Sequence, residues 1–511
     1  GRKLFLEHLS YEALAEVVAP IFEGLLDDPP ALTPRAEELI DLTHRMARAT
    51  LPGAAAESTA TAATLAGAGA PAVGGGEGRS PSTAPGRPAE RRPGDARRRL
   101  EPGAPFDLVV FWKQNDTGIY GRRQDMFLKY LLASGRVERA VHFDNPVAPE
   151  YLAKLYLRSA GSTTDHSRLI MRRTIERVAH RRDDGRVLHR TFLHAGGASR
   201  LAGLPPRERY LDHVRKVLRK AGVGDRPLVL WGYPSNLDLP ELIDGLQPDL
   251  VVTDVVDDNR TWSRPGSALY ARIEGNYADV LRRSDVVIAN CRPVVESMAP
   301  LADEIHLVPN GLELPDALPD GPRPPELAEL SGPIVGYVGN LSSRLDIDLI
   351  EAIARARPQW QIVLIGSTHL DRSILRLEGQ PNVHFPGVRP YDEALTFVRH
   401  FDVGIIPHLD NEMTRAMNPL KAFVYAAAGV PVVSTPIANI GELGDLIRVA
   451  EGRNGFLAAI EEALAEGRVK PDPDRLAPES WAARVDAVLA LIDAAAADPA
   501  HPAADDASPT P

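Results

Sequence analysis

The chain has 511 residues, of which 44% are hydrophobic, so two or three domains with their own cores are expected. Its formal net charge of −11 argues against a general nucleic-acid-binding protein. Cys291 is the single cysteine, which excludes an internal disulfide framework and a cysteine zinc cluster and indicates a reducing compartment. No run approaches the roughly 18 to 20 apolar residues that a membrane span requires, and the first residues do not resemble a signal peptide.

Residues 1–50 and 51–103 differ in composition. Residues 11–26 carry apolar side chains at helical spacing and predict a short helical segment within residues 1–50. The run from Leu9 is similar to the run from Leu476, so residues 1–50 are either the end of a preceding module or a plain helical extension. Because the first residue is not methionine, we expect a fragment or a processed chain. Residues 51–103 are rich in Ala, Gly, Pro, Ser and Thr and predict a disordered linker, whose terminal arginines either contact anionic lipid or polyphosphate or are solvated.

Residues 104–315 predict a first α/β domain. "FDLVVFW", residues 106–112, reads as a buried strand, and a loop with Gly118 and Gly121 joins it to a helix that ends at Gly135. A strand, a polar loop and a helix in this order build the crevice at which open α/β sheets bind ligands. The two glycines allow the backbone to approach a ligand, and Arg122 and Arg123 can reach anionic oxygens. Further strands are predicted at 137–144 and within 227–234 and 248–259, the last two each turning into a polar loop, whereas residues 145–200 are assigned only as helix with loops.

Residues 316–332 are proline-rich and predict an interdomain linker, and residues 333–470 predict a second α/β domain. A strand in 333–340, an amphipathic helix and a strand in 360–367 form one right-handed βαβ unit. A strand, a bend at Gly387 and another helix follow. Residues 471–495 predict a closing helix with one apolar face, and residues 496–511 predict a disordered tail.

The second domain contains "MNPLKAFVYAAAGVPVVST", residues 417–435. We expect Asn418 to cap a helix, Pro419 to occupy its first position and Gly429 to end it before a short buried strand. Free N–H groups at the helix start form an anion site, to which Lys421 adds a full charge. The segment therefore predicts a pyrophosphate site, the alternative being an ordinary amphipathic helix with a proline start and a glycine stop.

This segment resembles the donor-binding segment of the group 1, GT-B glycosyltransferases, which usually reads "NPxKxxEYxAxGxPVVxT". The resemblance covers about residues 104–495 and includes "VPNG", residues 308–311, at the crossing between domains. It implies an α/β fold of two Rossmann-like domains that face each other across a cleft. The reaction that it implies is transfer of a sugar from a nucleotide diphosphate sugar to a hydroxyl acceptor, with retention of configuration and without a protein nucleophile.

The resemblance also implies a set of site residues. The leaving diphosphate would be stabilised by Arg344 and Lys421, with Asn340 standing where arginine is frequent. Asp257 and Asp258 are candidates for binding sugar or acceptor hydroxyls, although adjacent carboxylates are usually solvated turn residues. Including these two, the catalytic candidates are Arg344, Lys421, Asp257 and Asp258. The donor-binding candidates are Gly339, Asn340, Gly366, Val388, Asn418, Pro419, Leu420, Val424 and Tyr425, and the loop that faces the phosphate or acceptor carries Gly118, Gly121 and Arg122.

Val424 departs from the family pattern, because a glutamate normally holds the ribose hydroxyls there. Loss of a hydrogen bond to a charged group costs about 1.5 to 3 kcal/mol, unless Tyr425 or the backbone compensates. An active transferase is therefore weighed against a GT-B scaffold that binds nucleotide weakly and partners another glycosyltransferase. A nucleotide-sugar epimerase shares the fold but would show more carboxylates in the cleft.

The remaining expectations concern cofactors, partners and location. No dinucleotide fingerprint or P-loop is present, which disfavours hydride transfer and P-loop chemistry. The histidines are scattered, so no metal site and no cofactor are expected, and His142 and His194 are expected to be core or surface residues. The expected partners are a nucleotide sugar donor, a glycan or lipid-linked acceptor of the cell envelope and another glycosyltransferase module, but no nucleic acid. The expected location is cytoplasmic, with peripheral contact at the inner face of the membrane.

Overall fold

The structure is a computed structural model that describes residues 98, 100–149, 151–152, 155, 166–178, 185–196, 204–318, 321–368, 371–415, 417–437, 439 and 446–497. The predicted helical segment 1–50, most of the predicted linker 51–103 and most of the predicted tail 496–511 lie outside the described residues. The end of the predicted linker is part of the fold, because Leu100 is buried in the first domain and the N–H of Gly103 donates to Asp493 (3.2 Å).

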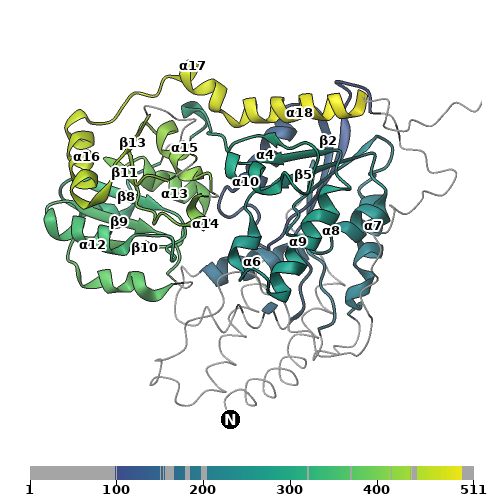
Figure 1. Cartoon of the computed structure of the whole chain (residues 1–511), viewed down its shortest axis with the longest axis horizontal. Helices are drawn as coiled ribbons and strands as arrows, with labels where there is room; N and C mark the ends of the chain where they lie inside the picture. The colour runs from purple at the N-terminus through teal and green to yellow at the C-terminus, as the bar shows by residue number, and fades with distance from the viewer. Residues whose placement is uncertain are drawn as a thin grey trace, which may run out of the picture.

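A seven-stranded parallel sheet forms the first domain, in the order β3-β2-β1-β4-β5-β6-β7. Its strands are β1 (Phe106–Phe111), β2 (Val137–Phe143), β3 (Val187–Arg190), β4 (Leu228–Gly232), β5 (Leu250–Val255), β6 (Val286–Ala289) and β7 (His306–Leu307). Its helices are α4 (Arg123–Ala133), α6 (His166–Val178), η1 (Arg207–Arg209), α7 (Tyr210–Lys220), α8 (Leu239–Leu246), η2 (Asn259–Trp262), α9 (Ala268–Leu281) and α10 (Arg292–Met298). Helices lie on both sides of the sheet (Figure 1), and every residue of the central strands β1 and β5 is buried.

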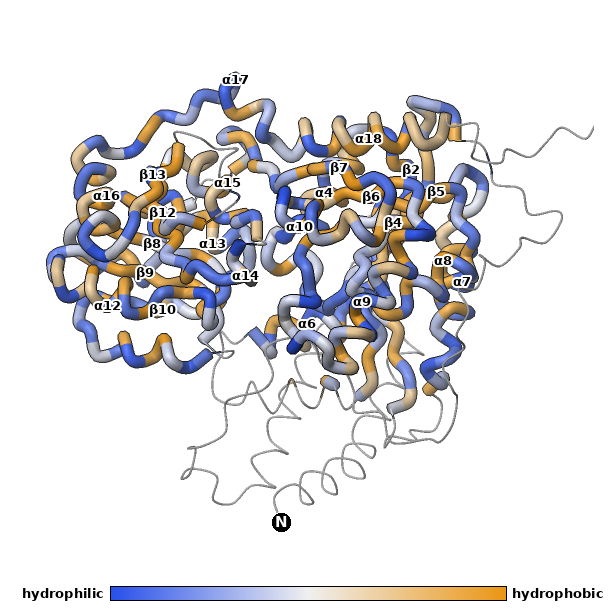
Figure 2. Tube along the Cα trace, viewed as in Figure 1, coloured by the Kyte–Doolittle hydropathy of each residue, from blue (hydrophilic) through white to orange (hydrophobic). Residues whose placement is uncertain are grey.

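A six-stranded parallel sheet forms the second domain, in the order β10-β9-β8-β11-β12-β13. Its strands are β8 (Ile334–Val338), β9 (Gln361–Ile365), β10 (Val383–Gly387), β11 (Val403–Ile406), β12 (Val432–Ser434) and β13 (Ile447–Val449). Its helices are α12 (Ile347–Ala356), η4 (Arg372–Gly379), α13 (Tyr391–Val398), α14 (Glu412–Arg415), α15 (Leu420–Ala427) and α16 (Gly452–Glu466). In both domains the hydrophobic strands lie inside and the hydrophilic helix faces lie outside (Figure 2).

Two segments connect the domains. The first contains η3 (Pro315–Ala317) and α11 (Pro325–Ala328), and Leu327 is buried in the second core, so the predicted linker packs against that domain. The second contains α17 (Pro473–Leu476), η6 (Ala477–Glu479) and α18 (Trp481–Ala497), which returns to cover the first domain (Figure 1). The apolar face of α18 is buried with α4 and β1, as the spacing of its apolar residues predicts.

These features confirm the α/β architecture of two Rossmann-like domains. Because β3 is a short edge strand with only its first and last residues buried, its sequence gives little strand signal, and residues 145–200 could not be assigned in advance. Among the described residues, no helix combines the length and the apolar character that crossing a bilayer requires.

Candidate functional site

Helix α15 begins one residue later than expected. Its first residue is Leu420, with Pro419 as the N-cap, and Asn418 makes no cap. The Asn418 side chain instead accepts from the N–H of Asn310 (2.9 Å), and its amide donates to the carbonyl of Asn439 (2.8 Å). The prediction of an Asn418 cap is therefore wrong, because this side chain joins α15 to the crossing between the domains.

The start of α15 leaves donors unused. The N–H groups of Leu420 and Lys421 have no hydrogen-bond acceptor among the described residues. Leu420 packs against the core of the first domain, so the first turn faces the junction of the two domains. Free N–H groups at the positive end of a helix form an anion site.

Lys421 lies in the same turn, in a partly buried position. Its Nζ is 3.4 Å from Nε2 of His408 and 5.0 Å from the centre of the Tyr337 ring. Burial lowers the pKa of Lys421 to about 7, and the nearby charge of Arg344 acts in the same direction. Among the residues that the structure describes, no carboxylate lies within ion-pair distance of Lys421.

Arg344 lies in the loop between β8 and α12. Its guanidinium donates to the Ser342 hydroxyl (3.2 Å) and contacts the sulfur of Met417 (3.7 Å). In the described part of the chain it has no carboxylate within ion-pair distance either. The structure thus brings two of the predicted catalytic residues, Arg344 and Lys421, to one place, with no acid to neutralise them.

The carboxyl ends of three neighbouring strands also carry predicted donor residues. Gly339 (φ +147°) follows β8, and a Cβ there would lie 3.2 Å from Cε of Lys421. Gly366 follows β9, where a Cβ would fall 1.8 Å from the Gly339 carbonyl, so no side chain fits. The N–H of Gly366 donates to the carbonyl of Gly387 (3.1 Å), the residue before the buried Val388. The Asn340 carbonyl accepts from the Tyr337 hydroxyl (3.4 Å). Backbone therefore lines the sheet edge beside Lys421.

Val424 and Tyr425 differ in accessibility. Val424 is partly buried against the second core and presents only methyl groups. Tyr425 is fully buried, its hydroxyl accepts from the N–H of Val338 (2.9 Å), and its ring occupies the space beside Gly404. Tyr425 is one of the two alternatives weighed for replacing the missing glutamate, and its hydroxyl is already committed to the backbone of β8.

Asp257 and Asp258 have different environments at the end of β5. Asp258 accepts from Nε (2.9 Å) and Nη2 (2.8 Å) of Arg260, and it caps η2 through the N–H of Arg260 (3.0 Å). Both carboxylate oxygens of Asp258 serve this local pair, and its role toward sugar or acceptor hydroxyls stays a prediction. Burial raises the pKa of Asp257, whereas the charges of Lys113 and Arg344 oppose that rise. The pKa of Asp257 is therefore influenced by charges from both domains.

The glycine-containing loop of the first domain is used partly for contact between domains. A Cβ on Gly121 (φ +56°) would lie 2.4 Å from the Tyr391 ring of the second domain. The N–H of Tyr391 donates to the carbonyl of Ile119 (2.7 Å). Gly118 (φ +68°) donates its N–H to Asp125 (2.8 Å). The close approach at Gly121 is thus to a protein side chain, contrary to the expected approach to a ligand.

Arg122, the third predicted residue of this loop, is 39% exposed. It forms an ion pair with Asp116 (2.8 Å) and donates to the Gln114 side chain (2.9 Å). Its charge is therefore already paired.

Lys113 and His408 escaped sequence reasoning, whereas Arg123 is expected to reach anionic oxygens of a ligand but pairs with a carboxylate within the protein. Lys113, at the end of β1, donates to Asn259 (3.5 Å), and burial lowers its pKa while Asp257 opposes the decrease. Arg123 is buried with Asp254, at 3.0 and 2.9 Å from its two oxygens. His408 follows β11. The available signal was position, because Lys113 and His408 both follow strands at the ligand-binding edge of a sheet.

His142 is buried in β2, and burial lowers its pKa well below the ordinary value, as expected for a core histidine. Among the described residues, no group of three or more His, Cys, Asp or Glu side chains is placed to hold a metal ion.

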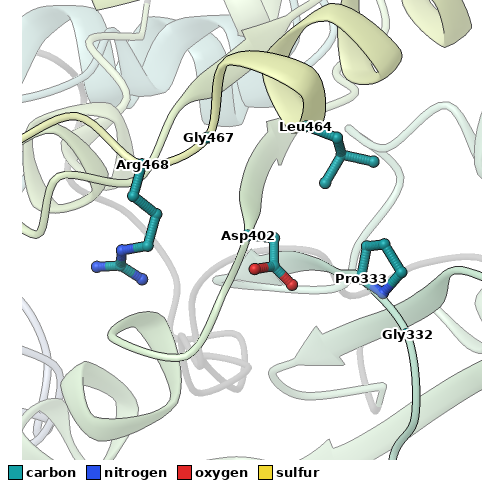
Figure 3. A pocket seen from close by; sticks show the side chains of 6 residues that line it. All are labelled: Gly332, Pro333, Asp402, Leu464, Gly467 and Arg468. Atoms are coloured by element: carbon teal, nitrogen blue, oxygen red, sulfur yellow. The ribbon is translucent and has the colours of Figure 1, made fainter.

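A surface pocket of about 370 Å³ lies at the opposite edge of the second sheet, lined by Gly332, Pro333, Asp402, Leu464, Gly467 and Arg468 (Figure 3). Arg468 donates to the carbonyls of Phe401 (2.9 Å) and Ala428 (2.6 Å), and Asp402 accepts from the N–H of Ile334 (2.7 Å). Both charged side chains serve the fold, and the pocket lies at the amino ends of β8 and β11. It is therefore separate from the predicted site.

Comparison with known sequences finds a family match for the second domain. Residues 332–470 match the family described as Glycosyl transferases group 1. The putative teichuronic acid biosynthesis glycosyltransferase TuaH of Bacillus subtilis (strain 168) is 27% identical over 199 residues. That match covers 37% of this chain and 50% of the relative, so the chain spans about half the length of this relative.

Solved structures resemble the chain more distantly. Sucrose-phosphate synthase from Thermosynechococcus elongatus aligns at 15% identity and a TM-score of 0.48, over 76% of this chain and 96% of that one. WaaG, a glycosyltransferase involved in lipopolysaccharide biosynthesis, aligns at 13% identity and a TM-score of 0.46, over 76% and 98%. These scores are too low to assign residues of this chain by superposition.

Proposed function

We propose that this chain, whose residues 332–470 form a domain of the group 1 glycosyltransferase family, transfers a sugar from a nucleotide diphosphate sugar to a hydroxyl acceptor. One observation carries the proposal. Arg344 and Lys421 lie beside two unused N–H groups at the start of α15, and the described residues offer no carboxylate partner to either cation. A diphosphate supplies the missing negative charge.

The cations would act on the leaving group. As the bond between sugar and diphosphate breaks, negative charge grows on the diphosphate while the sugar becomes oxocarbenium-like. Charges fixed in place before the reaction stabilise this transition state without reorganisation. A bound diphosphate also favours the ammonium form of Lys421, whose pKa is lowered to about 7 in the free protein. No metal or organic cofactor is required in this proposal.

The first domain would supply the acceptor side. Asp257 lies with Lys113 at the carboxyl edge of the first sheet, and its pKa responds to Arg344 of the second domain. In our proposal Asp257 accepts a hydrogen bond from the acceptor hydroxyl and orients it. An oxygen of the diphosphate would take the proton, and the configuration at the sugar would be retained. Proton NMR of the first product formed tests this, since an inverted anomer contradicts it.

The acceptor that we propose is a cell-envelope polysaccharide or a glycolipid. The support is the similarity to a relative named for teichuronic acid biosynthesis, over half of its length. A cytoplasmic location with peripheral contact at the membrane, and association with another glycosyltransferase module, fit this acceptor class and belong to the same proposal.

Calorimetric titration with UDP, GDP and their sugars tests the donor site. We expect binding by the wild-type chain and its loss in Lys421→Ala. Lys216→Ala, which removes an exposed lysine of α7, is the control and should leave binding unchanged. Absence of binding to the wild-type chain at millimolar ligand contradicts the transferase.

Val424 favours a second candidate function, a weakly binding scaffold that partners another glycosyltransferase. Its methyl groups cannot accept a hydrogen bond from a ribose hydroxyl. Val424→Glu decides between the two functions. If α15 faces the donor, the new carboxylate should tighten UDP binding by about tenfold to a hundredfold. An unchanged or weaker affinity supports the scaffold.

A further inference from the structure

His408 is held rigidly beside Lys421. It follows β11 and is only 2% exposed. The backbone N–H of His408 donates to the Thr435 hydroxyl (3.1 Å), and its backbone carbonyl accepts from the same hydroxyl (2.7 Å). Thr435 follows β12, so two neighbouring strands of the second sheet hold the backbone of His408 in place.

The direction of the hydrogen bond between His408 and Lys421 follows from chemistry. Burial lowers the pKa of His408 well below its ordinary value, and the charges of Lys421 and Arg344 lower it further. The imidazole is therefore neutral, with one N–H and one lone pair. An ammonium group can only donate, so Lys421 donates to Nε2 of His408 across 3.4 Å. The proton of His408 then resides on Nδ1, which is buried and has no hydrogen-bond partner among the described residues.

We propose that His408 is a positioning residue, a neutral hydrogen-bond acceptor that aims the Lys421 ammonium at the anion site without cancelling its charge. The inference rests on the proposed function only in naming the anion as a diphosphate. A carboxylate in the place of His408 would orient the ammonium as well, but its negative charge would offset the field that attracts a phosphate. A neutral acceptor provides direction and leaves the full charge available.

The groups around Lys421 are consistent with this role. Tyr337 of β8 presents its ring to the ammonium, and its hydroxyl is 3.5 Å from Nε2 of His408. Arg344, from the loop after β8, is the charge that acts on Lys421. Asp257 of the first domain interacts with Arg344. His408 is thus the neutral acceptor in direct contact with the Lys421 ammonium among the described residues.

The pH dependence of Lys421 acetylation tests the inference without a ligand. Acetic anhydride labels the neutral amine, and mass spectrometry of the Lys421 peptide gives the labelling rate at each pH. His408→Phe keeps a ring of similar size but removes the acceptor, so its midpoint should move to lower pH by at least about half a unit, with about twofold faster labelling at pH 6.5. His408→Gln retains an acceptor and should stay near the wild-type midpoint.

A third variant separates orientation from charge. His408→Glu provides a charged acceptor, so the Lys421 midpoint should move to higher pH while UDP affinity falls at least tenfold at pH 7. A purely structural role would not raise the Lys421 midpoint while it lowers the affinity for UDP. Thermal unfolding of each variant shows whether the fold is retained. If His408→Phe unfolds the chain, His408→Gln and His408→Glu still test the role of His408.

The outcomes distinguish the inference from the proposed function. Equal midpoints in wild type and His408→Phe, or the same shift in His408→Gln as in His408→Phe, overturn the role of His408. The shifts in the acetylation midpoint expected above support it, even if the wild-type chain binds no UDP. Failure of UDP to bind contradicts the proposed function alone.

Discussion

The contact between the domains and the anion site use charge in opposite ways. At the contact, Glu313 is 4% exposed and accepts from Lys129 and from the Tyr391 hydroxyl (2.9 Å), which come from different domains. At the anion site, Arg344 and Lys421 have no carboxylate within ion-pair distance among the described residues. Charges that hold the protein together are therefore paired within it, and charges left without an acid indicate where a ligand supplies one.

The buried pair of Arg123 and Asp254 should give the largest effect. Arg123→Met leaves the Asp254 carboxylate buried without its partner, so the free energy of unfolding should fall by about 3 to 5 kcal/mol. Urea denaturation followed by fluorescence measures the change. Arg282→Met is the control, because Arg282 is 61% exposed and its partner Asp279 is 50% exposed, so this surface ion pair should contribute at most about 1 kcal/mol. Equal losses of unfolding free energy in the two variants would contradict the distinction between charges that stabilise the fold and charges that bind a ligand.

Arg344 should behave in the opposite way. Arg344→Ala removes a charge-assisted bond to the diphosphate and should weaken UDP binding by about 1.5 to 3 kcal/mol, which is roughly tenfold to a hundredfold, with little change in stability. Calorimetry and thermal unfolding measure the two quantities. Arg355→Ala on α12, whose side chain is 66% exposed and pairs with Glu351, should change neither by much. A loss of stability with unchanged binding would assign Arg344 to the structural group.

The affinity for UDP should depend on pH through Lys421. Its pKa is lowered to about 7 in the free protein and should be higher in the complex, because the bound anion favours the ammonium form. Affinity is therefore greatest below pH 7 and should fall as the pH rises through 7, by up to about tenfold per unit. Titrations between pH 6.5 and 9 measure the slope. Lys421→Arg keeps its charge over this range, and a slope that persists in this variant would assign the dependence to another group.

Tyr391→Phe should give the smallest effect. It removes one hydrogen bond to Glu313 but leaves Lys129 to pair with it, so stability should fall by about 1 kcal/mol. Small-angle scattering with and without UDP reports whether the domain arrangement also loosens. A fall in stability as large as that of Arg123→Met would mean that the contact between domains depends on this single bond.

Much of the fold was predictable, whereas the site was predictable only in part. Apolar runs separated by glycine and polar loops identified most strands, and residues 417–435 identified α15 and Lys421. Contacts between distant segments were not accessible, as in Asn418, whose partner Asn310 is 108 residues away. Tyr425 matched a family position, yet a motif does not indicate which side of the helix its hydroxyl serves. Asp258 had a local signal that was overlooked, because Arg260 two residues later can pair with it.

Because α18 packs on the first domain, the first domain depends on a segment that follows the second domain in the chain. The first domain needs a segment that is synthesised after the second domain, because Trp481 and Val485 complete its apolar interior. During translation that interior stays unfinished until the second domain has left the ribosome. Removal of residues 477–497 should therefore cause aggregation of the domain that contains β1–β7, while the domain that contains β8–β13 stays folded.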